Sequence, residues 1–194
     1  MASYKELNEE LEQMKAEFFT PSTFSDSDIR PDKYIRSIMK DSAGNIWSGG
    51  YYNLKQIDFS RKNIRTYPGL NGITDIIEKD EKHMWIGTAT GLYLLDKESG
   101  EFQYMPIESF YINALYQSDN GLLYIGTSNS GLLIYDYENK SFEHFHKDNC
   151  PLISNNIYTI LSDEDQSILL STENSLTSYY PSEKVFHNWT KEQG

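Results

Sequence analysis

Met84-Trp85-Ile86-Gly87-Thr88 recurs along this 194-residue chain at a nearly fixed interval. It returns closely as Leu123-Tyr124-Ile125-Gly126-Thr127, more loosely as Ile46-Trp47-Ser48-Gly49-Gly50, and in eroded form as Ile168-Leu169-Leu170-Ser171-Thr172. A short strand that returns at a fixed period is typical of repeat architectures, in which each copy forms one supersecondary unit. The sequence therefore predicts a repeat protein with four copies.

The residues around this motif keep the same spacing in every copy. Counting backwards, a landmark stands at every third position, and in the first copy these landmarks are Ile35, Ile38, Asp41, Gly44 and Trp47. Counting forwards, each copy has a second apolar run, such as Leu92–Asp96, and then a segment that closes on an aromatic residue or Met. This register defines four units of about 33 residues, with one inserted residue in the third: 35–67, 73–105, 112–145 and 157–189.

Each unit divides into four short strands. Its apolar runs are rich in β-branched and aromatic residues, which fit a pleated strand better than a helix. The turns between the runs, such as Asp41-Ser42-Ala43-Gly44-Asn45, carry Gly or Asn, which tolerate positive φ. Four antiparallel strands per unit, with no helix between units, predict an all-β fold, a β-propeller of four-stranded blades. Leucine-rich and β-helical solenoids have shorter periods, and ankyrin or tetratricopeptide arrays need helices that these runs do not favour.

The residues before the first unit have a different pattern. Ser3 and Glu6 form a capping box, and Pro21 follows closely on the apolar residues, which are spaced alternately by three and four positions. This predicts a short N-terminal helix over 3–19, followed by a connector rich in Ser, Asp and Pro over 20–34. The expected organisation is thus a helix and connector in 1–34 and four blades in 35–194.

Composition excludes several classes of function. The formal charge of −12 argues against a nucleic-acid partner and against docking on an anionic membrane, because both need a Lys/Arg surface. The single Cys150 rules out an internal disulfide and a Cys-based zinc site. No apolar run is long enough to span a membrane, and the first 20 residues do not resemble a signal peptide. The protein is therefore either cytoplasmic or a segment of a longer exported chain.

No motif indicates catalysis. There is no nucleophile elbow, phosphate-binding loop or kinase motif, and 29 acidic residues single out no carboxylate pair. His144 and His146 alternate on one expected strand, but no third ligand lies near them in the sequence. We expect no catalytic residue, no metal site and no cofactor.

The repeats resemble those of a known family. Ile38–Trp47, Trp85–Asp96 and Tyr124–Phe145 are similar to the two-component regulator propeller repeat, found in sensor regions of hybrid two-component sensor histidine kinases, notably of Bacteroidetes. The connector Leu152–Ile157 also resembles the family's lead into a blade. Departures are Lys79 and Ser118 in place of the turn Asp, Asn53 in place of Gly, and the missing Gly-Thr pair in the fourth unit. These departures weaken individual turns and leave the period intact.

The resemblance implies a function. Members of the family carry many more blades, in seven-bladed propellers that precede a β-sandwich module, a transmembrane helix, a kinase and a receiver. This chain would then be a fragment: a non-catalytic, periplasmic sensor segment of an inner-membrane histidine kinase that detects a carbohydrate. Two alternatives remain open. One is a propeller scaffold for protein partners, and the other is an enzyme similar to streptogramin lyases, which need a His base and a metal-ligating acid at the ring centre.

A ligand site is expected on one face of the propeller. The loops that join strand four to the next strand one share that face with the loops that join strands two and three. It would present Tyr51, Tyr52, Asn71, Phe110, Tyr111 and Asn129. Aromatic rings stack on the C–H faces of sugars and amides bond their hydroxyls, so these residues predict sugar recognition unless the rings pack between blades.

The number of blades leads to one expectation about assembly. Four blades of this spacing form an open arc with two uncovered blade faces. We therefore expect the chain to self-associate as a homo-oligomer, with two copies closing one ring.

Overall fold

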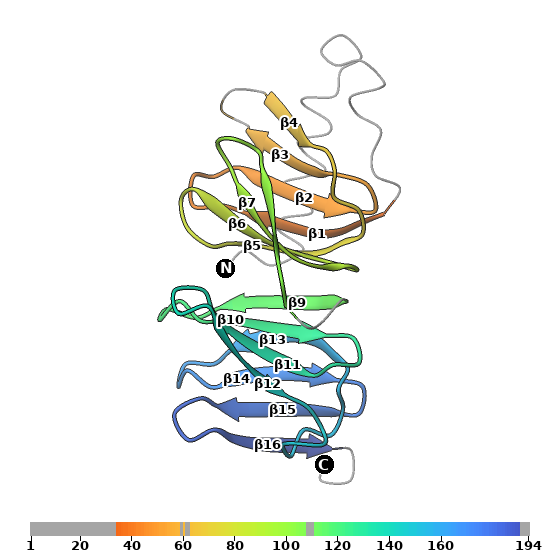
Figure 1. Ribbon diagram of the computed structural model, residues 1–194, viewed down its shortest axis with the longest axis vertical. Helices are drawn as coiled ribbons and strands as arrows, with labels where there is room; N and C mark the ends of the chain where they lie inside the picture. Colours follow the sequence, from red (N-terminus) through yellow and green to blue (C-terminus); the bar gives the residue numbers. More distant parts are fainter. Residues whose placement is uncertain (1–33, 59, 61–62, 108–110, 191–194) are drawn as a thin grey trace. The chain divides into compact units, whose positions relative to one another are not determined.

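The computed structural model describes residues 34–58, 60, 63–107 and 111–190 (Figure 1). In this part of the chain every regular element is a β-strand, so it contains no helix that could cross a membrane. The helix expected over 3–19 and the connector that follows it lie outside the described residues.

The described strands form four antiparallel sheets of four strands each, paired in chain order (Figure 1). Blades 1 and 2 comprise β1 (Ile35–Lys40), β2 (Ile46–Gly50), β3 (Leu54–Asp58) and β4 (Asn63–Tyr67), then β5 (Ile73–Glu78), β6 (His83–Thr88), β7 (Gly91–Asp96) and β8 (Phe102–Met105). Blades 3 and 4 comprise β9 (Ile112–Gln117), β10 (Leu123–Thr127), β11 (Leu132–Asp136) and β12 (Ser141–Phe145), then β13 (Ile157–Ser162), β14 (Ile168–Thr172), β15 (Ser175–Tyr180) and β16 (Val185–Thr190). The predicted all-β fold of four-stranded antiparallel blades is confirmed.

The chain divides into two compact units, residues 1–73 and 74–194. Blade 1 belongs to the first unit. Blades 2, 3 and 4 belong to the second, apart from Ile73 at the start of β5.

The recurring motif forms the second strand of every blade, and in three blades it is covered on both faces. All five residues of β2 and of β10 are buried, as are Met84–Thr88 in β6. In β14 burial alternates, with Leu169 and Ser171 only partly covered. A strand buried on both sides needs a continuous apolar run, which is why the motif shows no polar alternation.

Neighbouring blades of the second unit pack face to face. We call the face that meets the preceding blade the leading face, and the face that meets the following blade the trailing face. Successive side chains of a strand point to opposite faces, so a strand of blade 3 can contribute side chains to two buried clusters, one on each face. In β10, Leu123 and Ile125 face blade 2 in one buried cluster, while Tyr124 faces blade 4 in the other.

The glycine of the motif lets the blades approach closely. A Cβ added at Gly87 would lie 2.8 Å from Ile112 Cγ2, and one at Gly126 would lie 2.7 Å from Ile157 Cγ2. In both junctions the first strand of the next blade therefore sets an isoleucine directly on the glycine. The threonine that follows closes the next turn: Thr127 Oγ1 donates to Gly131 O at 2.7 Å.

The first turn of blade 2 differs from that of blade 1 in its hydrogen bonds. In blade 1, Asp41 accepts bonds from Asn45 N and, at 2.8 Å, from Trp47 Nε1. In blade 2, where Lys79 stands in place of this Asp, Trp85 Nε1 donates instead to Gln117 Oε1 of blade 3 at 2.8 Å. The departure in sequence thus turns a bond within a blade into a bond between blades.

Asp80 stabilises this turn in place of the missing aspartate. It accepts hydrogen bonds from Lys82 N, His83 N and Lys79 Nζ, at 2.9, 2.8 and 2.8 Å. Partial burial by itself raises the pKa of Asp80, but the bonds from Lys79, Lys82 and His83 outweigh it and hold the pKa well below its usual range. The turn therefore stabilises the ionised carboxylate.

Asp80→Asn is expected to lower the free energy of unfolding at pH 7 by about 1 kcal/mol, a value reduced for the exposure of the turn. A lowered folded-state pKa stabilises above the unfolded pKa of about 3.9, and this contribution is lost as the pH falls below it. The difference from wild type should therefore shrink progressively below about pH 4 in urea titrations. Asp119→Asn, in an exposed turn of blade 3, is the control. An equal loss for Asp80→Asn at every pH would contradict the assignment.

Candidate functional site

A polar pocket of about 350 Å³ lies in the second unit, where blades 3 and 4 meet. Three segments contribute: the β10–β11 turn, the connector from β12 to β13, and the β14–β15 turn. Half of its lining residues carry amide side chains: Asn129, Lys147, Ile153, Ser154, Asn155, Asn156, Glu173 and Asn174. The pocket thus lies on the side of the blades where the sequence predicts ligand binding.

The β10–β11 turn holds the connector in place. Gly131 N donates to Asn155 O at 2.8 Å, and a Cβ at Gly131 would lie 2.2 Å from Phe145 O. Gly131 also has a φ of 82°, so no other residue fits this position without strain. Asn129 adopts a φ of 75° in the same turn, a conformation that Asn tolerates better than most residues. The turn therefore brings Asn129 and Asn155 to one pocket.

Asn156 carries an unsatisfied acceptor. Its Oδ1 is buried and accepts no hydrogen bond from any described residue, while its Nδ2 donates to Tyr158 OH at 3.0 Å. A buried acceptor without a partner costs about 1–3 kcal/mol, a cost that a hydrogen-bond donor on a ligand would remove. Tyr158 itself is 48% exposed, which leaves its ring accessible beside the amide.

The net charge of the residues that line the pocket is close to zero. Lys147 and Glu173 are the charged residues among those that line it, and they are opposite in sign. The remaining polar groups are amides and one serine hydroxyl, which both donate and accept hydrogen bonds. This chemistry fits a neutral ligand with many hydroxyls better than a strongly charged one.

Three of the residues predicted to bind ligand lie together in the first unit. Tyr51 and Tyr52 are both more than half exposed, and their rings are 4.8 Å apart in an edge-to-face arrangement. Gly72 N donates to Tyr51 O at 3.0 Å, which holds the connector that carries Asn71 against this turn. This cluster is distinct from the pocket.

Two further predicted residues lie in the second unit. Ser128 N donates to Tyr111 O at 3.0 Å, so Tyr111 lies beside the turn that carries Asn129. Of the predicted residues, Asn129 lines the pocket. Phe110 lies outside the described residues.

The prediction missed Asn155, Asn156 and Asn174. A signal was present for the first, because Asn155 stands two residues before Ile157 as Asn71 stands two before Ile73. Asn156 and Asn174 had no comparable signal. Their place in the pocket depends on how the connector after β12 folds back.

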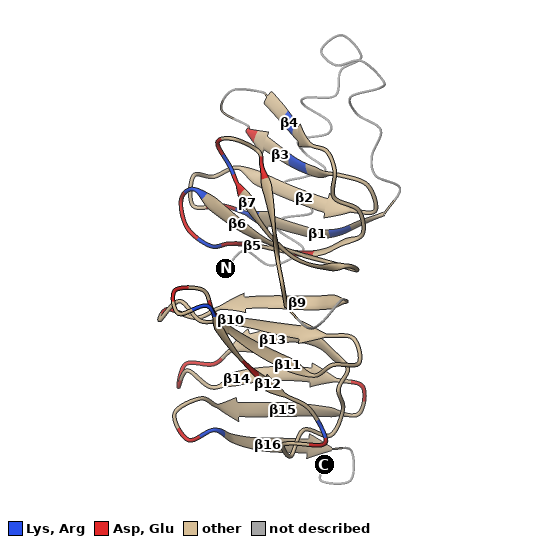
Figure 2. Ribbon diagram, viewed as in Figure 1, with Lys and Arg blue, Asp and Glu red and all other residues tan. Residues whose placement is uncertain are grey.

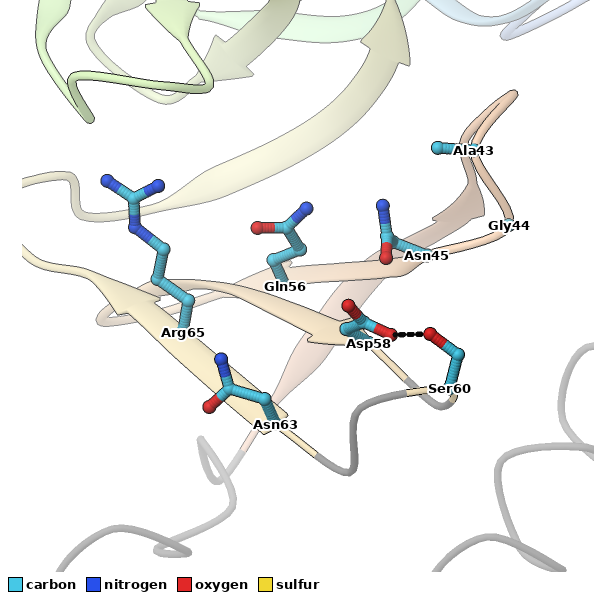
Figure 3. Close-up of a pocket in the computed structure, with 8 residues that line it drawn as sticks. All are labelled: Ala43, Gly44, Asn45, Gln56, Asp58, Ser60, Asn63 and Arg65. Carbon is cyan, nitrogen blue, oxygen red and sulfur yellow. Dashed lines mark hydrogen bonds between the residues drawn. The ribbon is translucent and has the colours of Figure 1, made fainter.

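A second hollow, of about 540 Å³, lies in blade 1 beside the β1–β2 and β3–β4 turns (Figure 3). Several of its polar side chains already bind one another or their neighbours. Ser60 Oγ donates to Asp58 Oδ1 at 2.7 Å, Gln56 Oε1 accepts from Tyr67 OH at 3.0 Å, and the Arg65 guanidinium lies 4.6 Å from the centre of the Tyr67 ring. We therefore place the candidate site at the smaller pocket.

His144 of β12 and His146, which directly follows this strand, each contact a neighbouring oxygen atom. His144 Nε2 lies 2.5 Å from Ser130 O, and His146 Nδ1 lies 3.6 Å from an Asp148 carboxylate oxygen. Across residues 34–190, wherever the structure is described, no group of three or more His, Cys, Asp or Glu side chains is arranged to hold a metal ion.

Residues 29–52, at the start of blade 1, match the sequence model of a family described as Two component regulator propeller. The match confirms, in the first unit, the resemblance seen across the repeats. No curated protein matches the sequence.

Solved structures have the same fold. The extracellular domain of the hybrid two-component system BT4673 from B. thetaiotaomicron matches with a TM-score of 0.70 and 22% identity, over 79% of this chain and 21% of that one. The corresponding domain of BT3049 from the same organism matches with a TM-score of 0.71 and 20% identity, over 81% of this chain and 25% of that one. This chain thus spans about a fifth to a quarter of the length of those domains.

A designed protein is also similar. The computationally designed Ika4 protein matches with a TM-score of 0.60 and 14% identity, over 82% of this chain and 92% of that one. The arrangement of these blades therefore makes up almost all of a crystallised chain of similar size.

Proposed function

We propose that this chain is a ligand-binding segment of the periplasmic sensor region of a two-component histidine kinase, and that it binds a carbohydrate without catalysing a reaction. The observation that carries the proposal is the amide-rich, nearly neutral pocket between blades 3 and 4, in a fold built from two-component regulator propeller repeats. The extracellular location stated for the similar B. thetaiotaomicron domains supports a periplasmic place.

The pocket has the groups that sugar recognition needs. Its amides can donate to and accept from sugar hydroxyls. The exposed ring of Tyr158, which does not line the pocket but is hydrogen-bonded to Asn156, offers an apolar surface for the C–H face of a sugar ring. Asn156 Oδ1 supplies an acceptor whose partner a ligand hydroxyl can provide. The volume falls at the lower end of the range for small-molecule sites, about 300–1,000 Å³, which favours one end of an oligosaccharide over a long polymer.

A ligand here would contact two blades at once. Asn129 belongs to blade 3, Asn174 to blade 4, and Asn155 and Asn156 to the connector between them. A ligand shifts a conformational equilibrium only as far as it binds one state more tightly than the other, so a site that joins two blades can report on their spacing. In a full receptor, a small movement between rigid parts would carry the signal toward the membrane.

Asn156→Ala is expected to weaken carbohydrate binding by about 10- to 100-fold, because it removes an amide that bonds the ligand. The fold should remain stable, since the variant also removes a buried unsatisfied acceptor. The measurement is a glycan array of oligosaccharides, followed by isothermal titration calorimetry of the best ligand with wild type and variant.

Asn71→Ala is the matched control, because Asn71 lies in the corresponding connector of the first unit. Binding that survives Asn156→Ala but is lost with Asn71→Ala or Tyr51→Ala would move the site to the Tyr51–Tyr52 cluster. A chain that binds no glycan on the array would contradict the proposed function.

A further inference from the structure

The trailing face of blade 4 is apolar and uncovered. Leu161 pairs with Leu169 across β13 and β14, and Leu176 pairs with Trp189 across β15 and β16, so all four side chains share this face. Leu161 and Trp189 are more than half exposed, and Leu176 is 47% exposed. These residues form the blade 4 patch: Leu161, Leu169, Leu176 and Trp189.

The same positions are buried in the two preceding blades. Leu92 and Leu132 correspond to Leu176, and both are completely buried. Trp85 and Tyr124, which correspond to Leu169, are also buried, as is Met105, which corresponds to Trp189. In each case the cover is the leading face of the following blade. The blade 4 patch thus has the register and character of a blade junction.

The strands of blade 4 are also uncharged. None of β13, β14, β15 and β16 contains a Lys, Arg, Asp or Glu, and the charges of this blade lie in its turns (Figure 2). Sheet faces that remain in water usually carry charged side chains, which oppose association with other sheets. This face is therefore suited to a partner rather than to solvent.

The two junctions of the second unit define what that partner must carry. The first strand of the next blade places a pair of apolar residues on the motif glycine: Ile112 and Leu115 on Gly87, and Ile157 and Ile160 on Gly126. Among the described strands, β1 carries one more such pair with an exposed member: Ile35 is exposed, and Ile38 is partly buried. Ile73 and Ile76 of β5 are buried. The complementary surface is thus present in the chain itself.

We propose that the blade 4 patch binds the leading face of blade 1 of a second copy of this chain, in a head-to-tail contact. Because the two surfaces differ, the contact is heterologous and produces either a closed ring or an open series of copies. The proposal does not depend on the carbohydrate site.

Ser171 should make this contact weaker than the junctions between neighbouring blades of the second unit. Ser171 occupies the position of Gly87 and Gly126, where a Cβ would lie within 2.8 Å of the docking isoleucine. The copies must therefore remain slightly further apart than neighbouring blades within one chain. Self-association should be reversible, and Ser171→Gly should strengthen it by about 10-fold as the steric conflict is removed.

Analytical ultracentrifugation of the full 194-residue chain, from about 1 to 200 µM, tests the proposal by mass action. Wild type should associate as its concentration rises. Leu176→Glu and Ile35→Glu should each remain monomeric, because each places a charged side chain on one of the two apolar surfaces. Their mixture should recover a one-to-one dimer, because the intact patch of one variant meets the intact leading face of the other.

Phe142→Glu, at an exposed apolar residue of β12, is the matched control and should associate like wild type. Circular dichroism confirms that each variant is folded. A monomeric wild type at the highest concentration would overturn the proposal. So would an Ile35→Glu variant that still dimerises, because the contact would then join two blade 4 patches, and so would a mixture that stays monomeric.

Discussion

Trp85→Ala is expected to destabilise the second unit by about 4 kcal/mol. The indole is buried in the cluster that joins blades 2 and 3, and it meets the rings of Tyr135 and Tyr137 edge to face at 6.3 and 5.5 Å. Truncation leaves a large cavity and removes the donor to Gln117 Oε1, so the loss combines missing packing with a missing hydrogen bond. Urea unfolding followed by circular dichroism measures the loss.

Two further variants separate the causes. Trp189→Ala makes the same change at an exposed position of blade 4 and should alter stability by less than about 1 kcal/mol. Trp85→Phe keeps most of the apolar volume but removes the donor, and should cost about 1–3 kcal/mol. Equal losses for Trp85→Ala and Trp189→Ala would mean that the junction between blades 2 and 3 contributes little to stability.

Gly126→Val is expected to destabilise the second unit by about 3 kcal/mol through overpacking. Any Cβ at this position lies 2.7 Å from Ile157 Cγ2, 3.2 Å from Ile157 Cβ and 3.3 Å from Ile160 Cδ1, so blade 4 must move away from blade 3 to relieve the contact. Valine is otherwise favourable in a strand, so a loss of stability can be attributed to the junction. The same urea titration measures it.

Ser171→Val is the matched control, because Ser171 holds the corresponding position on the uncovered face of blade 4. It should change the stability of the isolated chain by less than about 0.5 kcal/mol. Ile157→Ala in the Gly126→Val background should recover part of the lost stability, since the smaller side chain makes room for valine. Additive losses in that double variant would show that the two side chains do not compete for the same space.

The repeat register made most of the fold predictable. Strands alternate their side chains between two faces, and a blade between two others must be apolar on both, so the four motifs indicate buried second strands. The predicted units run from the first to the fourth strand of each sheet, except that β16 extends one residue further, to Thr190. The sequence predicts that Lys79 weakens its turn. In the structure, Asp80 accepts a hydrogen bond from His83 N within this turn, and the Trp85 indole donates to Gln117 of blade 3.

The candidate site was predictable only in part. The side of the blades followed from the connection order, and one of the residues predicted to bind ligand, Asn129, lines the pocket. The amides of the β12–β13 connector did not follow, because their position depends on the bond from Gly131 N to Asn155 O, which links residues far apart in the chain. Hydrogen bonds of this kind leave no periodic signal in a sequence.

Leu132 and Leu176 mark the limit of sequence reasoning for this protein. Both positions carry leucine at the same place in the repeat, and the sequence predicts correctly that both lie in the third strand of a blade. Leu132 is completely buried, however, and Leu176 is 47% exposed. Local propensity and spacing are properties of the strand itself, whereas burial requires a second sheet opposite it, and that depends on tertiary packing.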